Sequence, residues 1–393
     1  TQFASSAASD VYKRQGRPIV DVEEIEAVKK VLESPILAHG PVCAEFEKIF
    51  AELIGAKFAI SVASGTAALH LSLYASNIGP GDEVIVPAMS HVATAHAVEY
   101  CGAKPVFADV DPKSGNISPE SISTCLSKRT KAIIVVHFLG LPCEMDAINK
   151  IAQSVGALVF EDAALALGAK YGNKMSGNLA TAGCFSFYPI KHITSVEGGM
   201  VTTNDEELAR AIQQRKAFGY DHNHQTRTKP GIYDVPVLGY NYRMNEVEAA
   251  IGLCQLTKLK DRVTVRIDNY NKLKSVLEGI DEITIFEPHQ GKSVSSCYCL
   301  NAVLASNSGI RRDSIVQKLK DHGIGSSVHY PGPIPMMSYY KEKYKYVSGQ
   351  FPIAEWLANK TISLPVAPHV PIGFEDRIGS AIKKAILDAY KSI

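Results

Sequence analysis

Short apolar strands alternate with helical stretches over the first half of the chain, and this alternation limits the possible folds most strongly. Short strands rich in Val and Ile, with helices between them, favour an α/β fold whose mostly parallel sheet is covered on both faces. Ligands of such sheets bind beyond the carboxyl ends of the strands, so the residues there are the first candidates for chemistry. We predict strands over residues 58–63, 83–86, 105–110, 132–138 and 157–162, and helices over 66–76, 93–100, 119–126 and 145–155.

Three of these strand ends carry polar residues. Ser64-Gly65-Thr66 opens a helix whose N–H groups and positive dipole end suit a phosphate, although the same residues also form an ordinary N-cap. Glu161 and Asp162 close an apolar strand, where a carboxylate either holds a cation or caps the next segment. His91 either stacks on a flat ligand or lies half-buried in a loop. No Gly-x-Gly-x-x-Gly motif follows a strand, so the fingerprint of a dinucleotide-binding fold is lacking.

A lysine lies between two further apolar strands, one predicted over residues 184–188 and one opened by Gly198-Gly199. Burial of an ammonium group is costly, and the usual relief is a lowered pKa of the amine. An amine in that state is a ready nucleophile for a carbonyl, as in enzymes that form Schiff bases. Taken alone, Lys191 is more typical of a solvated lysine at a strand edge.

Together these residues have one economical explanation, a pyridoxal phosphate site. That cofactor needs a lysine, a carboxylate that keeps the pyridine nitrogen protonated, a phosphate cup and a planar stacking partner. Further motifs support this interpretation by their order: Ser64-Gly65-Thr66-Ala67-Ala68-Leu69-His70, Gly79-Pro80-Gly81-Asp82-Glu83-Val84, Val92-Ala93-Thr94-Ala95, Glu161-Asp162-Ala163-Ala164, Ser186-Phe187-Tyr188-Pro189-Ile190-Lys191, Glu197-Gly198-Gly199-Met200 and Asn241-Tyr242-Arg243-Met244. With these motifs the chain resembles, from about Arg17 to its C-terminus, the DegT/DnrJ/StrS-type nucleotide-sugar aminotransferases, which are fold-type I pyridoxal phosphate enzymes.

The resemblance implies a role for each matching residue. Lys191 is expected to hold the cofactor as a Schiff base and to act as the general base that moves the proton during transfer. Asp162 is expected to pair with the pyridinium nitrogen, so that the ring remains an electron sink. His91 matches the position whose side chain stacks on the ring. The phosphate is expected to bind Ser186, Thr66 and the backbone at Gly65 and Ala67.

The resemblance also implies partners. Asn241 matches an asparagine that reaches the phosphate of the neighbouring subunit, so we expect a homodimer with a shared active site. The expected substrates are glutamate, as the amino donor, and a nucleotide-linked keto sugar, often 6-deoxy, whose keto carbon receives the amine. Such reactions supply amino sugars for surface polysaccharides.

The chain departs from the family pattern at several positions near the lysine. Leu165 stands where the family commonly has a glutamine that bonds the phenolic oxygen of the cofactor, and a leucine cannot donate a hydrogen bond. His192 replaces a common asparagine, and Ser195-Val196 replaces small residues. A pyridoxal phosphate-dependent sugar dehydratase or lyase therefore stays open, as does a non-catalytic, cofactor-binding regulatory protein. Related dehydratases replace the lysine with histidine, so the presence of Lys191 favours amine transfer.

The resemblance and the local composition of the chain predict its division into domains. Residues 1–15 are rich in Ser and Ala without an apolar period, and we interpret them as a non-native or disordered leader. We expect a large cofactor-binding α/β domain over 16–255. A smaller C-terminal α+β domain is expected over 256–393, with strands at 283–285 and 297–303.

Composition argues against several other classes of protein. The formal net charge of +1 makes no electrostatic case for nucleic acid or an anionic membrane, and no apolar run approaches the ~18 residues of a membrane span. Eight scattered cysteines suggest free thiols in a reducing cytoplasm. We expect no metal site, because Cys297 and Cys299 are too close for a zinc hook and Asp221-His222-Asn223-His224 is more typical of a flexible loop.

Overall fold

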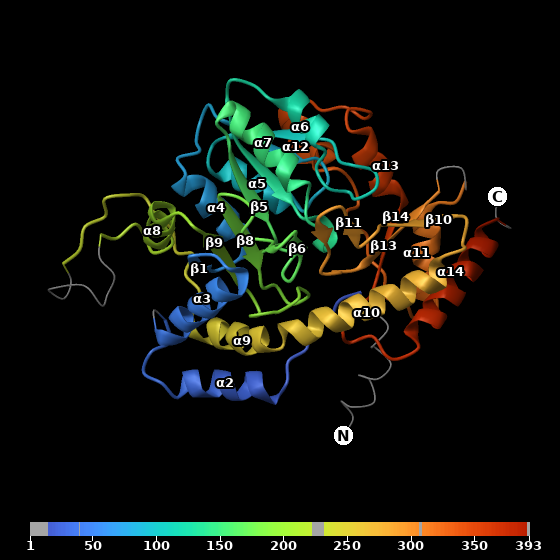
Figure 1. The fold of residues 1–393 in the computed structure, drawn as a ribbon, viewed down its shortest axis with the longest axis horizontal. Coiled ribbons are helices and arrows are strands. Elements are labelled where there is room, and N and C mark those ends of the chain that lie inside the picture. Colours follow the sequence, from blue (N-terminus) through green and yellow to red (C-terminus); the bar gives the residue numbers. More distant parts are fainter. Residues whose placement is uncertain (1–14, 39, 222–231, 306–308, 391–393) are drawn as a thin grey trace.

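A computed structural model describes residues 15–38, 40–221, 232–305 and 309–390 (Figure 1). Its centre is a seven-stranded sheet with the order β1–β9–β8–β5–β4–β2–β3, in which β9 alone runs antiparallel to its neighbours. This confirms the predicted α/β fold with a mostly parallel sheet. The strands are β1 (Phe58–Val62), β2 (Glu83–Pro87), β3 (Lys104–Ala108), β4 (Thr130–Val136), β5 (Leu158–Asp162), β8 (Ala182–Ser186) and β9 (Gly199–Thr203).

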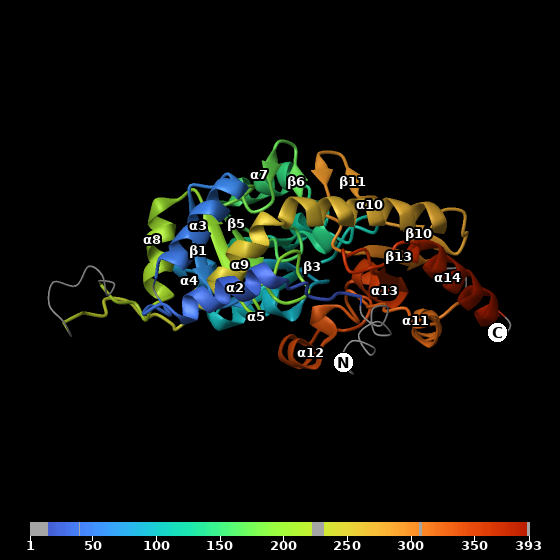
Figure 2. The same ribbon diagram turned by 90° about the horizontal axis from the view of Figure 1, so that it is seen from below.

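Helices cover both faces of this sheet, which explains why its strands are continuous apolar runs. In β4, Ala132 and Ile134 face a core that includes α4, α5 and α8, whereas Ile133 and Val135 face the opposite side. That side is covered by α6 and α7 over β4 and, toward the β1 end of the sheet, by α3 and α9, with α2 packed on α9 (Figures 1 and 2). The helices are α2 (Val22–Leu32), α3 (Pro41–Ile54), α4 (Gly65–Ala75), α5 (Val92–Tyr100), α6 (Pro119–Cys125), α7 (Met145–Val155), α8 (Glu206–Arg215) and α9 (Glu246–Thr257).

Several predicted strands begin or end at different residues from those expected; those expected over 105–110 and 132–138, for example, are β3 (Lys104–Ala108) and β4 (Thr130–Val136). The strand expected over residues 184–188 is β8, which lies two residues earlier because the chain leaves the sheet at Phe187 to enter the lysine turn. Its second residue, Gly183, permits a close approach, since an added Cβ would lie 2.3 Å from the Cα of Gly177. The strand expected over 297–303 is β13 (Leu300–Leu304), because Cys297 has a φ of 51°, which is incompatible with an extended strand.

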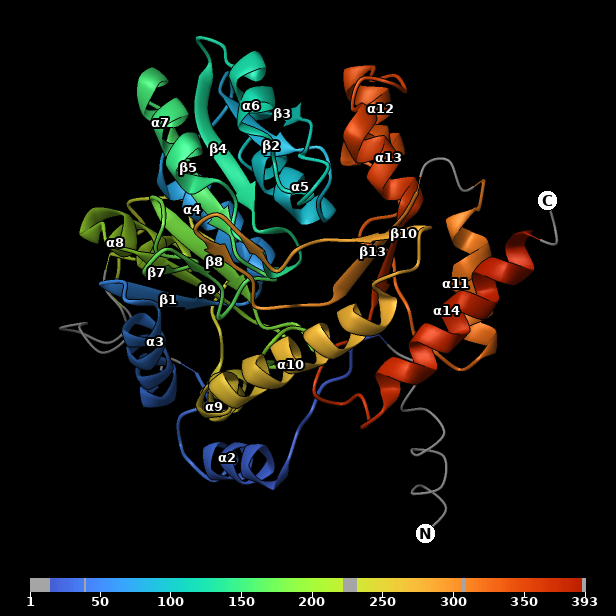
Figure 3. The same ribbon diagram turned by 45° about the vertical axis from the view of Figure 1, so that its right-hand side comes forward.

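The C-terminal part builds a second, smaller core. The long helix α10 (Leu259–Leu277) runs from the large sheet to an antiparallel sheet of three strands, ordered β10–β13–β14 (Figure 3). Apolar residues of α10, α11 and α14 pack with these strands in one cluster. The remaining elements of this part are β10 (Ile283–Ile285), β14 (Thr361–Leu364), α11 (Arg312–Asp321) and α14 (Phe374–Tyr390).

Other C-terminal segments pack against the large sheet instead. Tyr340 of α12 (Ser338–Tyr344) and Leu357 of α13 (Pro352–Lys360) belong to the same apolar cluster as Phe107 of β3. A further sheet, of four strands, pairs the hairpin of β6 and β7 with that of β11 and β12. The domain division at residue 255 stays a prediction, since the chain beyond it contributes to both cores. These four short strands are β6 (Lys170–Tyr171), β7 (Lys174–Met175), β11 (His289–Gln290) and β12 (Ser293–Val294), and two 3₁₀ turns cover Phe138–Gly140 and Ile334–Met336.

Two expectations fall mainly outside the described residues. The leader expected over 1–15 lies outside them except for Gln15, which is buried. His222, Asn223 and His224 also lie outside them. Within the described part of the chain, no helix combines the length and the apolar character needed to cross a membrane.

Candidate active site

Lys191 lies in the turn between β8 and β9, at the end of the sheet where the parallel strands finish. The backbone N–H of Lys191 donates to the carbonyl of Tyr188 (3.0 Å), and its Nζ lies 5.7 Å from the centre of the Tyr298 ring. Burial lowers the pKa of this lysine to about 8, while the negative charge of Asp162 opposes the shift. Lys191 is half-buried as a residue, and its role toward a cofactor stays a prediction.

Asp162 ends β5 and faces the same site. Its Oδ2 accepts a hydrogen bond from the Thr94 hydroxyl (2.8 Å), and its Oδ1 accepts one from the backbone N–H of Ala164 (3.2 Å). The preceding residue, Glu161, points to the other face of the sheet, because side chains alternate along a strand. Of the two strand-end carboxylates, the structure thus brings only Asp162 to the lysine.

The expected phosphate cup lies where α4 begins. An added Cβ on Gly65 would lie 2.8 Å from the Cβ of Ser186, so only glycine lets the start of this helix approach the end of β8 so closely. Gly65 and Thr66 are the first two residues of α4, whose N–H groups have no partner within a helix. The N–H of Ala67, one of the groups expected to bind the phosphate, already donates a hydrogen bond to the Ser64 hydroxyl (3.1 Å).

His91 caps the N-terminus of α5. Its Nδ1 accepts a hydrogen bond from the Ala93 N–H (3.2 Å), and its ring centre lies 6.3 Å from that of Tyr330. Partial burial and the positive charge of Lys191 lower the pKa of His91, against the effect of Asp162. His91 is exposed and lies close enough to Lys191 and Asp162 to interact with both charges, as a stacking partner at this site would.

Asn241 is exposed and lies on a segment that passes beside the cup, since the carbonyl of its neighbour Tyr242 accepts the N–H of Ala63 (2.8 Å). The rings of Tyr240 and Tyr242 stack at 5.0 Å, and the phenol of Tyr242 lies 3.3 Å from Nδ1 of buried His70. Aromatic packing therefore fixes the backbone on both sides of Asn241.

Sequence reasoning assigned no role to several groups that surround the lysine. Thr94 and Ser90 come from the start of α5 and the loop before it, and Tyr298, His329 and Tyr330 come from the C-terminal part. Burial and the charge of Lys191 lower the pKa of His329 to about 4, and burial and the charge of Asp162 raise that of Tyr330. Thr94 stands in one of the motifs of the resemblance, Val92-Ala93-Thr94-Ala95, so that motif was the available signal for it.

Comparison with known proteins agrees with this geometry. A family model described as the DegT/DnrJ/EryC1/StrS aminotransferase family matches residues 18–383. The chain belongs to this family. It is 38% identical over 377 residues to the spore coat polysaccharide biosynthesis protein SpsC of Bacillus subtilis (strain 168), a match that covers 95% of this chain and 96% of SpsC.

Solved structures of aminotransferases share the fold. The Helicobacter pylori PseC, an aminotransferase involved in the biosynthesis of pseudoaminic acid, matches with a TM-score of 0.89 and 29% identity, covering 96% of this chain and 100% of PseC. The sugar aminotransferase Spr1654 of Streptococcus pneumoniae, described as putative, matches in its PLP form with a TM-score of 0.88 and 25% identity, covering 95% and 98%. The chain is thus a fold-type I, pyridoxal phosphate-dependent aminotransferase, as the resemblance implied.

The described residues fit the cofactor of this family. A lysine amine with a lowered pKa, a carboxylate at the next strand end and a narrow glycine cradle at a helix N-terminus supply the three polar contacts that pyridoxal phosphate needs. Leu165 is buried and offers only its backbone carbonyl, to the Ser296 hydroxyl (3.4 Å). A partner for the phenolic oxygen must therefore come from elsewhere than position 165.

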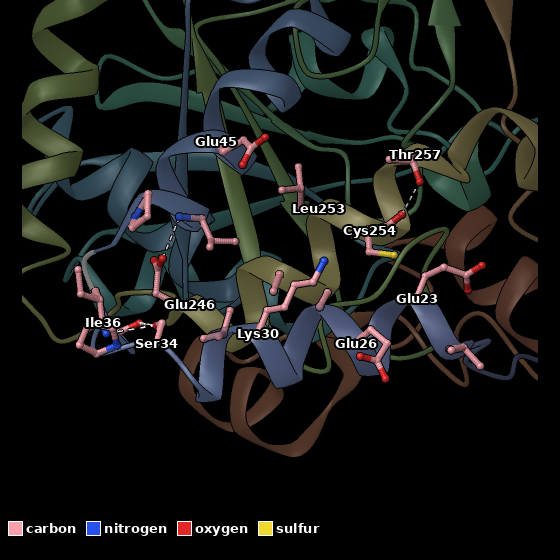
Figure 4. Close-up of a pocket in the computed structure, with 17 residues that line it drawn as sticks. Glu23, Glu26, Lys30, Ser34, Ile36, Glu45, Glu246, Leu253, Cys254 and Thr257 are labelled. Atoms are coloured by element: carbon pink, nitrogen blue, oxygen red, sulfur yellow. Dashed lines mark hydrogen bonds between the residues drawn. The ribbon is translucent and has the colours of Figure 1, made fainter.

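An apolar groove of about 770 Å³ lies away from this site, between α2, α3 and α9 (Figure 4). None of the predicted site residues lines it. The buried carboxylate at its edge, Glu246, accepts the backbone N–H groups of Gly40 (3.1 Å), Val42 (2.8 Å) and Cys43 (3.2 Å). Glu246 therefore fixes the start of α3 and is not available for chemistry.

Proposed function

We propose that this aminotransferase moves an amino group from glutamate to a keto carbon of a nucleotide-linked keto sugar, in the biosynthesis of amino sugars for surface polysaccharides. The observation that carries the proposal is the buried Lys191 amine, which shares the strand-end site with the Asp162 carboxylate in a chain of this family. The relatives support the substrate class, since PseC acts in pseudoaminic acid biosynthesis and SpsC in spore coat polysaccharide biosynthesis.

Lys191 and Asp162 are the proposed catalytic residues. When bound, pyridoxal phosphate supplies an electron sink for the negative charge left on a substrate carbon after proton removal. The lowered pKa of Lys191 leaves a larger share of its amine unprotonated near neutral pH, so Nζ can take up and return that proton. Asp162, held on both oxygens, keeps the pyridine nitrogen protonated.

The remaining proposed contacts hold the cofactor in one orientation. Gly65, Thr66 and Ser186 border the cradle for the phosphate, and Ala67 contributes backbone next to it. His91 stacks on the ring from the start of α5. Since the Ala67 N–H is bonded to Ser64, we assign the direct backbone donors to Gly65 and Thr66.

The proposed assembly is a homodimer in which Asn241 reaches the phosphate bound by the other subunit. Exposed apolar side chains support this, because they lie on the segment that leads to Asn241: Phe218, Ile232, Tyr233, Val235 and Leu238. Such side chains close to a site are typical of an interface.

We place the enzyme in the cytoplasm, where its eight unpaired cysteines would stay reduced.

A direct assay tests the proposed reaction. Purified protein reconstituted with pyridoxal phosphate is mixed with glutamate and a panel of UDP-, GDP- and dTDP-linked keto sugars. We expect equal amounts of 2-oxoglutarate and amino sugar for at least one of them, and none with Lys191→Ala. Consumption of a keto sugar without glutamate would support a dehydratase instead, and bound cofactor with no reaction at all would support a regulatory protein. Because Lys191 and Asp162 lie together in the site, we favour neither alternative.

Mixed dimers test the shared site. In a dimer of one Lys191→Ala and one Asn241→Ala subunit, one of the two sites keeps both residues, so activity should return to about half that of the wild type. The matched control combines Lys191→Ala with Asp162→Ala, which belong to the same subunit's site, and should stay inactive. Mixed dimers that form without regaining activity would refute the role of Asn241 across the interface.

A further inference from the structure

Asp162 is the end of a chain of buried hydroxyl groups. The Ser90 Oγ lies 2.8 Å from the Thr94 Oγ1, which in turn lies 2.8 Å from the Asp162 Oδ2. Ser90 and Thr94 are 1% and 0% exposed, so water does not compete for these hydrogen bonds. Ser90 follows β2, whereas Asp162 ends β5, so the contact joins two strand ends through the first turn of α5.

The direction of the hydrogen bonds follows from counting protons. A carboxylate only accepts, so the single hydroxyl proton of Thr94 is donated to Asp162. The Thr94 oxygen is then free to accept, and the proton between the two hydroxyl groups comes from Ser90. The chain therefore runs one way, from Ser90 through Thr94 to the carboxylate.

We infer that Thr94, supported by Ser90, is a positioning residue that sets the orientation and the basicity of the Asp162 carboxylate toward the pyridine nitrogen of the cofactor. Thr94 holds Oδ2 and the Ala164 N–H holds Oδ1, so the carboxylate cannot turn without breaking a buried hydrogen bond. Without Thr94, Oδ2 would lack a donor and would draw the pyridine proton toward itself, which weakens the electron sink. This inference rests on the proposed function of Asp162.

The other charged or titratable groups around Asp162 are all retained when Thr94 is changed. Lys191 comes from the turn after β8, His91 from the cap of α5, Tyr330 from the C-terminal part and Cys184 from β8, and each interacts electrostatically with the carboxylate. A change confined to the Thr94 hydroxyl therefore isolates its hydrogen bond from the charges.

The test compares holoenzymes of Thr94→Val, Thr94→Ser and Ser90→Ala with Thr202→Val. Thr202 is a matched control, since it is also 0% exposed and its hydroxyl donates to backbone carbonyls, of Gly177 (2.6 Å) and at longer range of Gly183 (3.3 Å), and not to Asp162. Three quantities are measured: the pH midpoint of the visible absorbance of the bound cofactor, the dissociation constant of pyridoxal phosphate, and the thermal midpoint.

Thr94→Val should shift the absorbance midpoint by about half a pH unit or more and weaken cofactor affinity about tenfold, the effect of one hydrogen bond to a charged group. Thr94→Ser should stay within about twofold of the wild type, because it keeps the donor. Ser90→Ala should shift the midpoint in the same direction by less. Thr202→Val should lower the thermal midpoint as much as Thr94→Val and leave the absorbance midpoint unchanged.

An absorbance midpoint that Thr94→Val leaves at the wild-type value overturns the inference, and the proposed function then stands. Should the valine variant fail to fold, Ser90→Ala decides: an unshifted midpoint in that variant overturns the inference. A wild-type protein that binds no pyridoxal phosphate refutes the proposed function and this inference with it.

Discussion

Glu161 and Asp162 are adjacent carboxylates, but making Glu161 neutral should lower the stability of the protein, whereas making Asp162 neutral should lower its activity. Glu161 is fully buried and accepts three hydrogen bonds, from the N–H of Gly177 (2.6 Å), the N–H of Leu179 (2.7 Å) and Nε2 of His137 (2.9 Å). Nδ1 of His137 accepts the Cys143 N–H (3.2 Å), so its other nitrogen is the one that donates to Glu161. Glu161 thus ties the loop after β7 to the underside of the sheet.

Glu161→Gln should therefore destabilise the protein. The amide oxygen can replace only one carboxylate oxygen, so its NH₂ group must face a backbone N–H that no longer has an acceptor. A lost hydrogen bond to a charged group costs about 1.5–3 kcal/mol, and an unsatisfied buried donor costs about 1–3 kcal/mol. We expect a loss of about 3 kcal/mol, a large share of a typical stability of about 5–15 kcal/mol.

Asp162→Asn should instead leave the stability nearly unchanged and reduce the activity. Its oxygen can keep the Ala164 N–H, and the Thr94 hydroxyl can rotate to accept from the new NH₂ group, so the free energy of unfolding should change by about 1 kcal/mol or less. The neutral amide cannot hold a pyridinium proton, however, so the rate of amine transfer should fall by about two orders of magnitude or more.

Urea unfolding of the cofactor-free variants, followed by circular dichroism, measures the first effect, because bound cofactor would otherwise add its own stabilisation. Single-turnover reaction of the reconstituted proteins with glutamate measures the second effect. Glu161→Gln should react within about threefold of the wild type, because its side chain lies on the face opposite the site. A Glu161→Gln protein of unchanged stability, or one that loses activity as severely as Asp162→Asn, would refute this assignment of the two faces.

Three further predictions concern the lysine and the phosphate cradle. Since the pKa of Lys191 is lowered to about 8, the rate at which the cofactor-free protein takes up pyridoxal phosphate should rise with pH and level off above a midpoint near 8; a midpoint near the ordinary lysine value of about 10.4 would contradict the burial of the amine. Gly65→Ala should weaken cofactor binding about tenfold or more, because its Cβ would lie 2.8 Å from that of Ser186, whereas Gly332→Ala, with open space around its Cβ, should bind as the wild type does. Borohydride reduction of the reconstituted protein, followed by peptide mass spectrometry, should place the cofactor on Lys191, and a label on another lysine would exclude Lys191 from this role.

Local patterns predicted the elements of the sheet and the residues at strand ends. The alternation of Val- and Ile-rich strands with helices is a short-range signal, and both faces of β4 are buried as it implied. Lys191 and Asp162 were proposed because an ammonium or a carboxylate is costly at a buried strand end without a chemical reason, and the resemblance to the family then implied their roles. The early end of β8 was missed, since it depends on where the chain leaves the sheet, at Phe187, to enter the lysine turn.

The parts of the site that could not be predicted come from contacts distant in sequence. Thr94 lies 68 residues before Asp162, and its type alone does not distinguish a carboxylate partner from an ordinary helix position. Tyr298 reaches the lysine only because the chain returns from the smaller core to the large sheet. The bonding of the Ala67 N–H to Ser64 depends on the local geometry of the cap, which the Ser-Gly-Thr pattern does not specify.

The visible absorption spectrum of the reconstituted protein, recorded before and after excess glutamate and again after 2-oxoglutarate, tests the central claim most directly. We predict a visible band from cofactor held by Lys191, its loss when glutamate delivers its amine, and its return when 2-oxoglutarate removes that amine. A protein that develops no band with pyridoxal phosphate would contradict the account of the site, and a band that ignores glutamate would contradict the proposed donor.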